Sequence, residues 1–259
     1  MFYRVHFKYS FLIVFTIFNS SCIYHIALKA LPSNDQAIRY VKGAENCYSP
    51  GHISVAISAN PSVYRSIDKN LSFFIIAFNN SKDLVNFSTE NIFASNSGYS
   101  LKVFTYEELI VEAESERRSK VFSAKLAGVA QSLNASYLGN EYHRGTYMDY
   151  SGNLHGFYSG HTYKPSKVAK ELSAIQTQTE QKLSNINSAF NQEKYYINNC
   201  ILRKHTLLPE QYHYGYIKIQ RPRYIDRSII ITVIIKNEEH KFIYNQNIID
   251  SSSCLCIGF

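Results

Sequence analysis

The sequence lacks the local motifs that mark the common enzyme classes. It contains no Gly-x-Ser-x-Gly nucleophile turn, no phosphate-binding loop and no dinucleotide fingerprint. It also has no Cys-x-x-Cys pair, so its five cysteines give little support to a metal site. We therefore expect a non-enzymatic protein without a cofactor. The alternative is a secreted hydrolase whose catalytic residues come together only in the fold.

Charge is also scarce, and tryptophan is absent. Charged residues make up 18% of the chain, whereas tyrosine occurs 21 times and phenylalanine 16 times, a profile that favours β-structure. The formal net charge is +7. Without Arg4 and Lys8, which lie in the N-terminal segment, 25 basic residues face 20 acidic ones, which leaves +5. So mild and dispersed an excess excludes nucleic acid as the expected partner.

Residues 1–31 have the pattern of an export signal. A short basic start is followed by an apolar run of eight residues and then by small polar residues, in the order Arg4 to Lys8, Phe11 to Phe18 and Asn19 to Ser21. Such a signal places the rest of the chain outside the cytoplasm. We expect a protein of the outer or inner membrane that faces the periplasm, or a protein of the cell surface.

Three processing outcomes fit this segment. Cys22 stands where bacterial lipoproteins are acylated, although Asn19 replaces the usual aliphatic residue three positions earlier. Cleavage could instead follow Ala30, or the segment could stay uncut as an anchor, because Tyr9 to Leu28 is about 20 residues without a full charge. The expected partners are therefore the membrane, through a lipid or an N-terminal anchor, and an unknown envelope protein.

Four other cysteines follow, and an even number fits pairing in an oxidising compartment. They are Cys47, Cys200, Cys254 and Cys256. The last two are separated by one residue and are not expected to pair with each other, because a strand holds such side chains ~6–7 Å apart. One of them could pair with Cys47 or Cys200.

Two segments of the chain have the texture of β-structure. Residues 32–51 are rich in Pro, Gly and Asn and predict a linker, whereas 52–104 and 200–259 contain short apolar or alternating runs separated by turn residues. Residues 212–245 predict a three-stranded meander, with the run Ile229 to Ile235 as a central strand. We expect the two segments to form the halves of one β-sandwich.

Between these halves the hydrophobic period becomes helical. Thr105 and Glu108 form a capping box that starts a helix of residues 105–138. The second half of this helix is rich in Ala, Gly and Ser, which favours close packing on a neighbouring helix; a membrane-active protein that inserts this helix is the alternative function. A second helix is expected from Ser166 to about Ile197. The two helices predict an antiparallel helical hairpin over residues 105–198, and hence an α+β fold.

The connection between the helices, residues 137–165, combines tyrosines with glycines and favours turns or small hairpins. Its tyrosines are the predicted partner-binding residues, since Tyr on Gly-rich loops offers half-polar contact area: Tyr142, Tyr147, Tyr150, Tyr158 and Tyr163. The competing interpretation is that they fold back over the first helix. Three histidines in the same segment are weak candidates for metal ligands, because their spacing matches no metal motif: His143, His155 and His161.

Three short segments resemble a loose group of bacterial envelope proteins. They are Asn79 to Ser81 after an apolar strand, Asn91 to Phe93 followed by Leu101 to Leu109, and Thr206 to Gly215 before a strand. Proteins of that group are secreted or lipid-anchored, Ig-like in fold and largely without an assigned activity. The resemblance implies an Ig-like antiparallel β-sandwich with the helical hairpin inserted in it, and an exported structural or interaction protein. It implies no catalytic residues.

Overall fold

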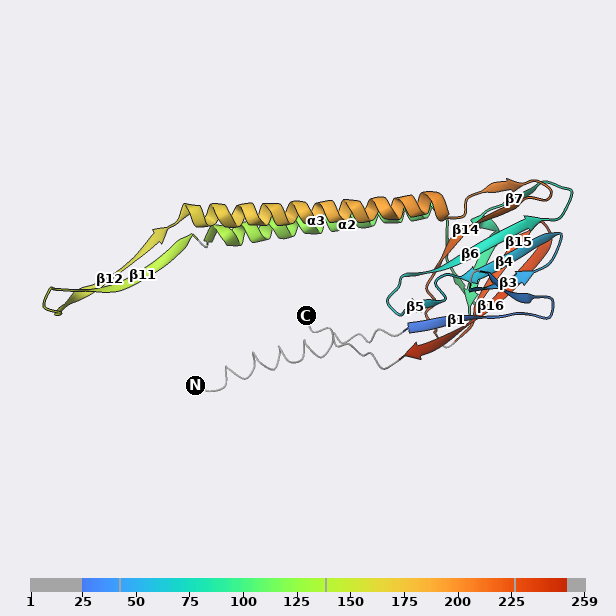
Figure 1. The fold of residues 1–259 in the computed structure, drawn as a ribbon, viewed down its shortest axis with the longest axis horizontal. Coiled ribbons are helices and arrows are strands. Elements are labelled where there is room, and N and C mark those ends of the chain that lie inside the picture. Colours follow the sequence, from blue (N-terminus) through green and yellow to red (C-terminus); the bar gives the residue numbers. More distant parts are fainter. Residues whose placement is uncertain (1–24, 42, 138, 226, 251–259) are drawn as a thin grey trace. The chain divides into compact units, whose positions relative to one another are not determined.

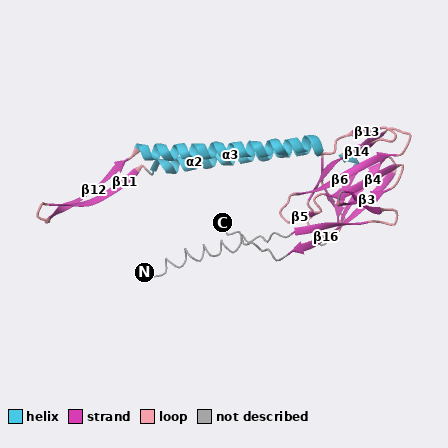
Figure 2. Cartoon of the chain, in the orientation of Figure 1, coloured by secondary structure: helices cyan, strands magenta, loops and turns pink. Residues whose placement is uncertain are grey.

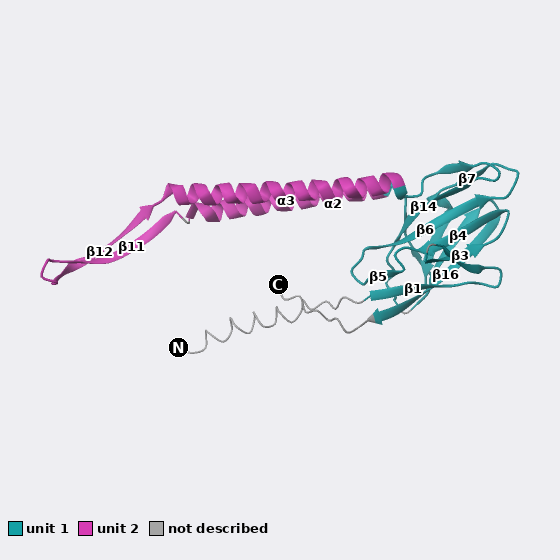
Figure 3. Cartoon of the chain, viewed as in Figure 1, with its two compact units in different colours: residues 1–108, 200–259 teal, residues 109–199 magenta. Residues whose placement is uncertain are grey.

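The computed structural model describes residues 25–41, 43–137, 139–225 and 227–250 (Figure 1). Within these residues the fold is α+β, with two α-helices and sixteen strands in several antiparallel sheets. The chain divides into two compact units, one of residues 1–108 and 200–259 and the other of residues 109–199 (Figure 3).

The first unit contains two six-stranded sheets. One has the strand order β5 (Val63–Arg65), β1 (His25–Leu31), β16 (Glu238–Asp250), β15 (Ile229–Ile235), β8 (Ile92–Asn96) and β9 (Tyr99–Leu101). The other has the order β10 (Val103–Phe104), β14 (Tyr212–Gln220), β6 (Asn70–Asn79), β4 (Ile53–Ala59), β3 (Ala44–Ser49) and β2 (Ala37–Val41). A short pair of strands, β7 (Val85–Phe87) and β13 (His205–Leu207), and the 3-10 turn η1 (Thr89–Asn91) complete the unit.

Alternation along the strands decides which side chains enter the core. In β6 every second residue is buried, from Leu71 through Phe73 and Ile75 to Ala77, and the residues between them are only partly covered. β14 and β4 flank β6: β14 pairs with residues 70–78 of β6, and β4 pairs with residues 73–79. The long apolar run of β6 is therefore a central strand, as its composition indicates.

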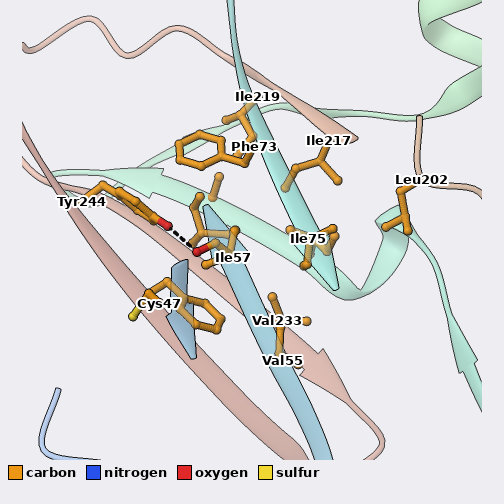
Figure 4. Packing of buried hydrophobic residues seen from close by; sticks show 14 of the residues in the cluster. Cys47, Val55, Ile57, Phe73, Ile75, Leu202, Ile217, Ile219, Val233 and Tyr244 are labelled. Atoms are coloured by element: carbon orange, nitrogen blue, oxygen red, sulfur yellow. Dashed lines mark hydrogen bonds between the residues drawn. The ribbon is translucent and has the colours of Figure 1, made fainter. Parts of the chain in front are cut away.

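One hydrophobic core joins the two six-stranded sheets. The ring of Phe73 from β6 meets the ring of Tyr244 from β16 edge-on, with their centroids 5.1 Å apart. Tyr244 crosses the core and donates a hydrogen bond of 3.0 Å from its hydroxyl to the carbonyl of Ile57 in β4 (Figure 4). This bond satisfies the one polar atom of a side chain that is only 2% exposed.

Each six-stranded sheet combines strands from before and after the helices. β14 lies between β10 and β6 in one sheet, whereas β15 lies between β16 and β8 in the other. The predicted meander of residues 212–245 is therefore wrong, because the chain changes sheets between β14 and β15. The central position of Ile229–Ile235 is confirmed.

The N-terminal segment enters the fold earlier than predicted. β1 begins at His25, pairs with both β16 and β5, and buries Ile26, Leu28 and Ala30 in the core. Cleavage after Ala30 would remove this strand, and a membrane span reaching Leu28 would compete for the same side chains. Residues 25–31, which the sequence pattern assigns to the N-terminal segment, are thus part of the folded first unit. Cys22 lies outside the described residues.

The predicted linker of residues 32–51 contains two strands instead. β2 and β3 form a hairpin at the edge of the second sheet, and β3 also pairs with β4. Cys47 in β3 is fully buried. The Pro, Gly and Asn residues of this segment lie mostly in the turns around the strands, which is why composition alone indicated a linker.

The remaining part of the chain contains two long helices, and a β-hairpin lies between them in the sequence (Figure 2). The order is α2 (Tyr106–Tyr137), β11 (Asn140–Met148), β12 (Leu154–Tyr163) and α3 (Pro165–Cys200). The predicted capping box starts α2: the amide of Thr105 donates to the Glu108 carboxylate at 3.0 Å, and the amide of Glu108 donates to the Thr105 hydroxyl at 3.2 Å.

The helices contact each other at several levels. Arg117 of α2 donates to the side-chain carbonyl of Asn187 in α3 at 3.3 Å and lies over the ring of Phe190. Farther along α2, Gly128 is so close to Thr179 that a Cβ atom on the glycine would lie 2.7 Å from the threonine hydroxyl. Late positions of α2 thus meet early positions of α3. Small residues permit this approach, so the interpretation of close helix packing is the one that the contacts favour over membrane insertion.

Candidate functional site

The β11–β12 hairpin is the most distinctive surface of the described residues. Its strands pair from Asn140 with Tyr163 to Met148 with Leu154, with one irregularity beside Met148. They form a sheet of only two strands, so each strand has a backbone partner on one side alone. The segment 137–165, whose glycines predict turns or small hairpins, therefore forms one long, regular hairpin.

Glycines and tyrosines of this ribbon face each other across the strands. Tyr158 pairs with Gly145, and Tyr147 pairs with Gly156. A Cβ atom on Gly145 would lie 2.5 Å from the Tyr158 ring, and one on Gly156 would lie 2.8 Å from the Tyr147 ring. Each ring thus covers the bare backbone of the opposite strand, an arrangement known to support glycines in sheets. This explains why tyrosine and glycine alternate in the sequence.

The other face of the ribbon carries different aromatic groups. By the two-residue alternation of strands, Tyr142, Phe157 and His161 share this face. The rings of Tyr142 and His161 are in contact, with centroids 5.1 Å apart. Phe157 is exposed over 66% of its surface, although it is a large apolar side chain. Exposed aromatic side chains at this density are typical of surfaces that bind other proteins.

Asp149 organises the turn at the tip of the hairpin. Its carboxylate accepts hydrogen bonds from the amides of Ser151 and Asn153 and from the side-chain amide of Asn153, and lies 3.0 Å from Nε2 of His155. The bonds from Asn153 and His155 lower the pKa of Asp149 to about 2. The side chain of Tyr150, in this turn, is fully exposed to solvent.

Two ion pairs lie at the base of the hairpin. Glu141 of β11 lies 2.7 Å from the ammonium group of Lys164 and 3.2 Å from that of Lys167. Hydrogen bonds from Lys164 and then Lys167 lower the pKa of the Glu141 carboxyl. Gly139 lies under the ring of Tyr163 at the same end of the hairpin.

The predicted partner-binding tyrosines therefore occupy one ribbon but different positions on it. Tyr147 and Tyr158 share a face, Tyr142 lies on the opposite face, Tyr150 is in the turn, and Tyr163 is at the base. All five are exposed. Because Tyr147 and Tyr158 pack on the hairpin's own glycines, the interpretation in which they cover the first helix is wrong.

The three histidines do not converge on one point. His143 and His161 lie on opposite faces of the ribbon, because they belong to consecutive cross-strand pairs, His143 with Gly160 and Tyr142 with His161. His155 is engaged with Asp149 at the tip, and His143 lies 3.9 Å from Glu141 near the base. Among the described residues no group of three or more potential ligands is placed to hold a metal ion.

Two of the predicted disulfide cysteines are described, and both are free thiols. Cys47 is buried in the core, and its burial raises the pKa of the thiol to about 11. Because the thiolate is the form that attacks electrophiles and binds metals, a thiol with so high a pKa is a poor nucleophile and a poor metal ligand. Cys200 is partly exposed at the end of α3. Cys254 and Cys256 lie outside the described residues.

Sequence reasoning missed a cluster of serine, histidine and glutamate in the first unit. Nδ1 of His240 lies 2.9 Å from the Ser49 hydroxyl, and its Nε2 lies 3.8 Å from the Glu238 carboxylate. Burial lowers the pKa of His240. Both Ser49 and His240 are buried, so no substrate reaches the hydroxyl. The nearby amides of His52 and Ile53 already donate to Glu238, so they are not available to hold an oxyanion. The cluster therefore supports the fold.

Comparisons with known proteins leave the chain without a named relative: no family model matches it, and neither a curated protein nor a solved structure does. Among the described residues, no helix has both the length and the apolar character needed to cross a membrane.

Proposed function

We propose that this protein is exported, anchored in the cell envelope through a lipid on Cys22, and acts without catalysis by presenting the β11–β12 hairpin to an envelope partner. The observation that carries the proposal is the exposure of aromatic side chains on both faces and at the tip of a two-stranded ribbon. Such a ribbon also offers unpaired backbone groups on its outer edges, which can add to a partner's sheet.

The N-terminal pattern supports the anchored form. The basic start, the apolar run and Cys22 follow the order of a lipoprotein signal. Acylation at Cys22 would leave β1 complete, because the strand begins three residues later at His25. Of the three processing outcomes, this is the one that keeps Ile26, Leu28 and Ala30 available for the core.

The architecture that we propose is an Ig-like β-sandwich with an antiparallel helical hairpin inserted between its halves. The single core shared by the two six-stranded sheets supports the sandwich. The descending order of contacts between α2 and α3, from Arg117 with Asn187 to Gly128 with Thr179, supports the antiparallel hairpin. In this arrangement the β11–β12 hairpin forms the connection between the helices.

Photocrosslinking tests the contact surface directly. A benzophenone amino acid at Tyr150 or Phe157 should give a crosslinked partner in intact cells, because both side chains are exposed. The same probe at Tyr40, a 72% exposed tyrosine of β2, is the matched control. Equal crosslinking from positions 40 and 150, or none from either hairpin position, would show that the hairpin is not the contact surface.

Metabolic labelling tests the anchor separately. A palmitate analogue should label the wild-type protein, and the Cys22→Ser variant should lose the label. Recovery of unlabelled, soluble mature protein from the wild type would contradict the lipoprotein assignment.

A further inference from the structure

Helix α2 exposes a stripe of large apolar side chains that no described residue covers. We define the α2 stripe as six residues that are each 57–74% exposed: Val111, Phe122, Leu126, Val129, Leu133 and Tyr137. Isolated exposed apolar residues are ordinary, but five of these six, from Phe122 to Tyr137, follow one another along the helix and form a continuous patch of the kind that marks an interaction surface.

The six residues lie on one side of the helix. At about 100° per residue they fall within an arc of about 80°, some 160° around from the buried positions Ala113, Gly128 and Ala135. The other residues of this arc between Val111 and Tyr137 are Ser115 and Ser119, so the arc contains no charge. α2 thus presents mainly small residues and Arg117 to α3, and large apolar side chains on the opposite side.

The stripe continues into a groove between the two helices. The groove has a volume of about 700 Å³ and is lined by Val129 and Leu133 from the stripe and by Leu172 from α3. A partner that packs on the stripe can therefore also reach α3.

The spacing of the arc is symmetric about position 124. Val111 and Tyr137 are equidistant from this position, as are Ser115 and Leu133, Ser119 and Val129, and Phe122 and Leu126. Two copies of α2 that run antiparallel about this centre would place each residue opposite its counterpart. Serines would then meet the larger Leu133 and Val129, which is the alternation of small and large side chains that well-packed helices use.

We propose that a second copy of this chain covers the α2 stripe, and that the two copies pair antiparallel about Ala124. In a two-fold contact both copies use the same surface, so residues at equal distances from the centre face each other. The symmetric spacing of the arc meets this requirement. The six side chains expose roughly 700 Å² per copy, since each aromatic residue alone carries ~150–250 Å². Pairing buries up to about 1,400 Å² in total, within the ~1,200–2,000 Å² of specific stable interfaces.

Cysteine crosslinking in intact cells tests the pairing and its direction. Two differently tagged full-length chains are produced together, one with Ser115→Cys and the other with Leu133→Cys. Mild oxidation should yield a mixed dimer that carries both tags, because the two positions face each other across the proposed centre. Ser115→Cys alone is the control: its two copies would lie about 27 Å apart along the helices, too far for a disulfide. A dimer formed through position 115 alone would overturn the antiparallel arrangement.

Sedimentation of the purified full chain in detergent provides a second measurement. Leu126→Glu with Leu133→Glu should raise the dimer dissociation constant at least tenfold without loss of helical circular dichroism. Ala127→Glu changes an exposed residue outside the arc and should leave the constant unchanged. A monomeric wild type overturns the proposal. If that monomer binds vesicles of phosphatidylethanolamine and phosphatidylglycerol through the stripe, and the double variant does not, lipid is the occupant instead.

Discussion

The ring of Tyr158 lies directly over Gly145 on the neighbouring strand of the β11–β12 hairpin. Because a two-stranded sheet is only marginally stable in water, such cross-strand contacts decide whether the ribbon keeps its shape. The partner-binding surface that we propose therefore depends on glycines as much as on tyrosines.

Gly145→Ala should displace the Tyr158 ring. The added methyl group would lie 2.5 Å from ring atoms at the end of a flexible side chain, so the ring moves and the backbone stays. We expect the single α-proton at position 145 of the variant to lack the ring-current shift that the glycine α-protons show in the wild type by NMR, at a cost of about 0.5–1 kcal/mol to the hairpin. Gly160→Ala is the control, because nothing lies within 4 Å of its Cβ position. Unchanged shifts in Gly145→Ala would contradict the ring placement.

Strand β1 should be indispensable for folding. A chain that begins at Cys22 retains Ile26, Leu28 and Ala30, whereas a chain that begins at Leu31 loses three buried side chains and one of the two strands that pair with β16. Each large buried side chain is worth about 1.5–3 kcal/mol, which is a substantial part of the stability of a domain. We expect a cooperative thermal transition for the longer chain only. A similar transition in both chains would mean that β1 is not part of the core.

Cys47 should be inert in the folded protein. Its pKa of about 11 leaves almost no thiolate at pH 8, and its side chain is buried. Iodoacetamide followed by mass-spectrometric mapping should modify Cys200 and leave Cys47 unmodified, and both should react in urea. A peptide joining Cys47 to Cys254 or Cys256 would contradict the free thiol at position 47 and support the disulfide predicted from the sequence.

Acid should destabilise the first unit through His240. Burial lowers the pKa of this imidazole, an effect that outweighs the attraction of Glu238. The unfolded chain therefore takes up a proton at a higher pH than the folded one, so stability is complete above the ordinary pKa of about 6.5 and declines as the pH falls below it. In urea titrations at pH 7, 6 and 5, His240→Gln should give a shallower decline of the unfolding free energy than the wild type. His52→Gln, at an exposed position, should follow the wild type; identical slopes in all three proteins would rule out His240 as the cause.

Local pattern alone predicted the apolar strands of the first unit and the two long helices. The alternation in β4 and β14, the apolar run of β6 and the capping box at Thr105 act between residues close in sequence, and the structure has strands and a helix at these places. The same is true of the central position of Ile229–Ile235, since an apolar strand with free edges would aggregate.

Tertiary structure decided what depends on contacts between distant residues. β1 could not be distinguished by sequence from the end of the predicted signal, because an apolar strand and the end of an export signal have similar compositions; only the pairing of residues 25–31 with β16 shows that they form a strand. The Tyr and Gly residues of 137–165 form a ribbon because Tyr147 faces Gly156 and Tyr158 faces Gly145, and this register is not visible from composition. Likewise, the sequence of α2 contains both a small-residue side and a large apolar side, but only the contacts of α3 with Gly128 show which side is covered and which remains exposed.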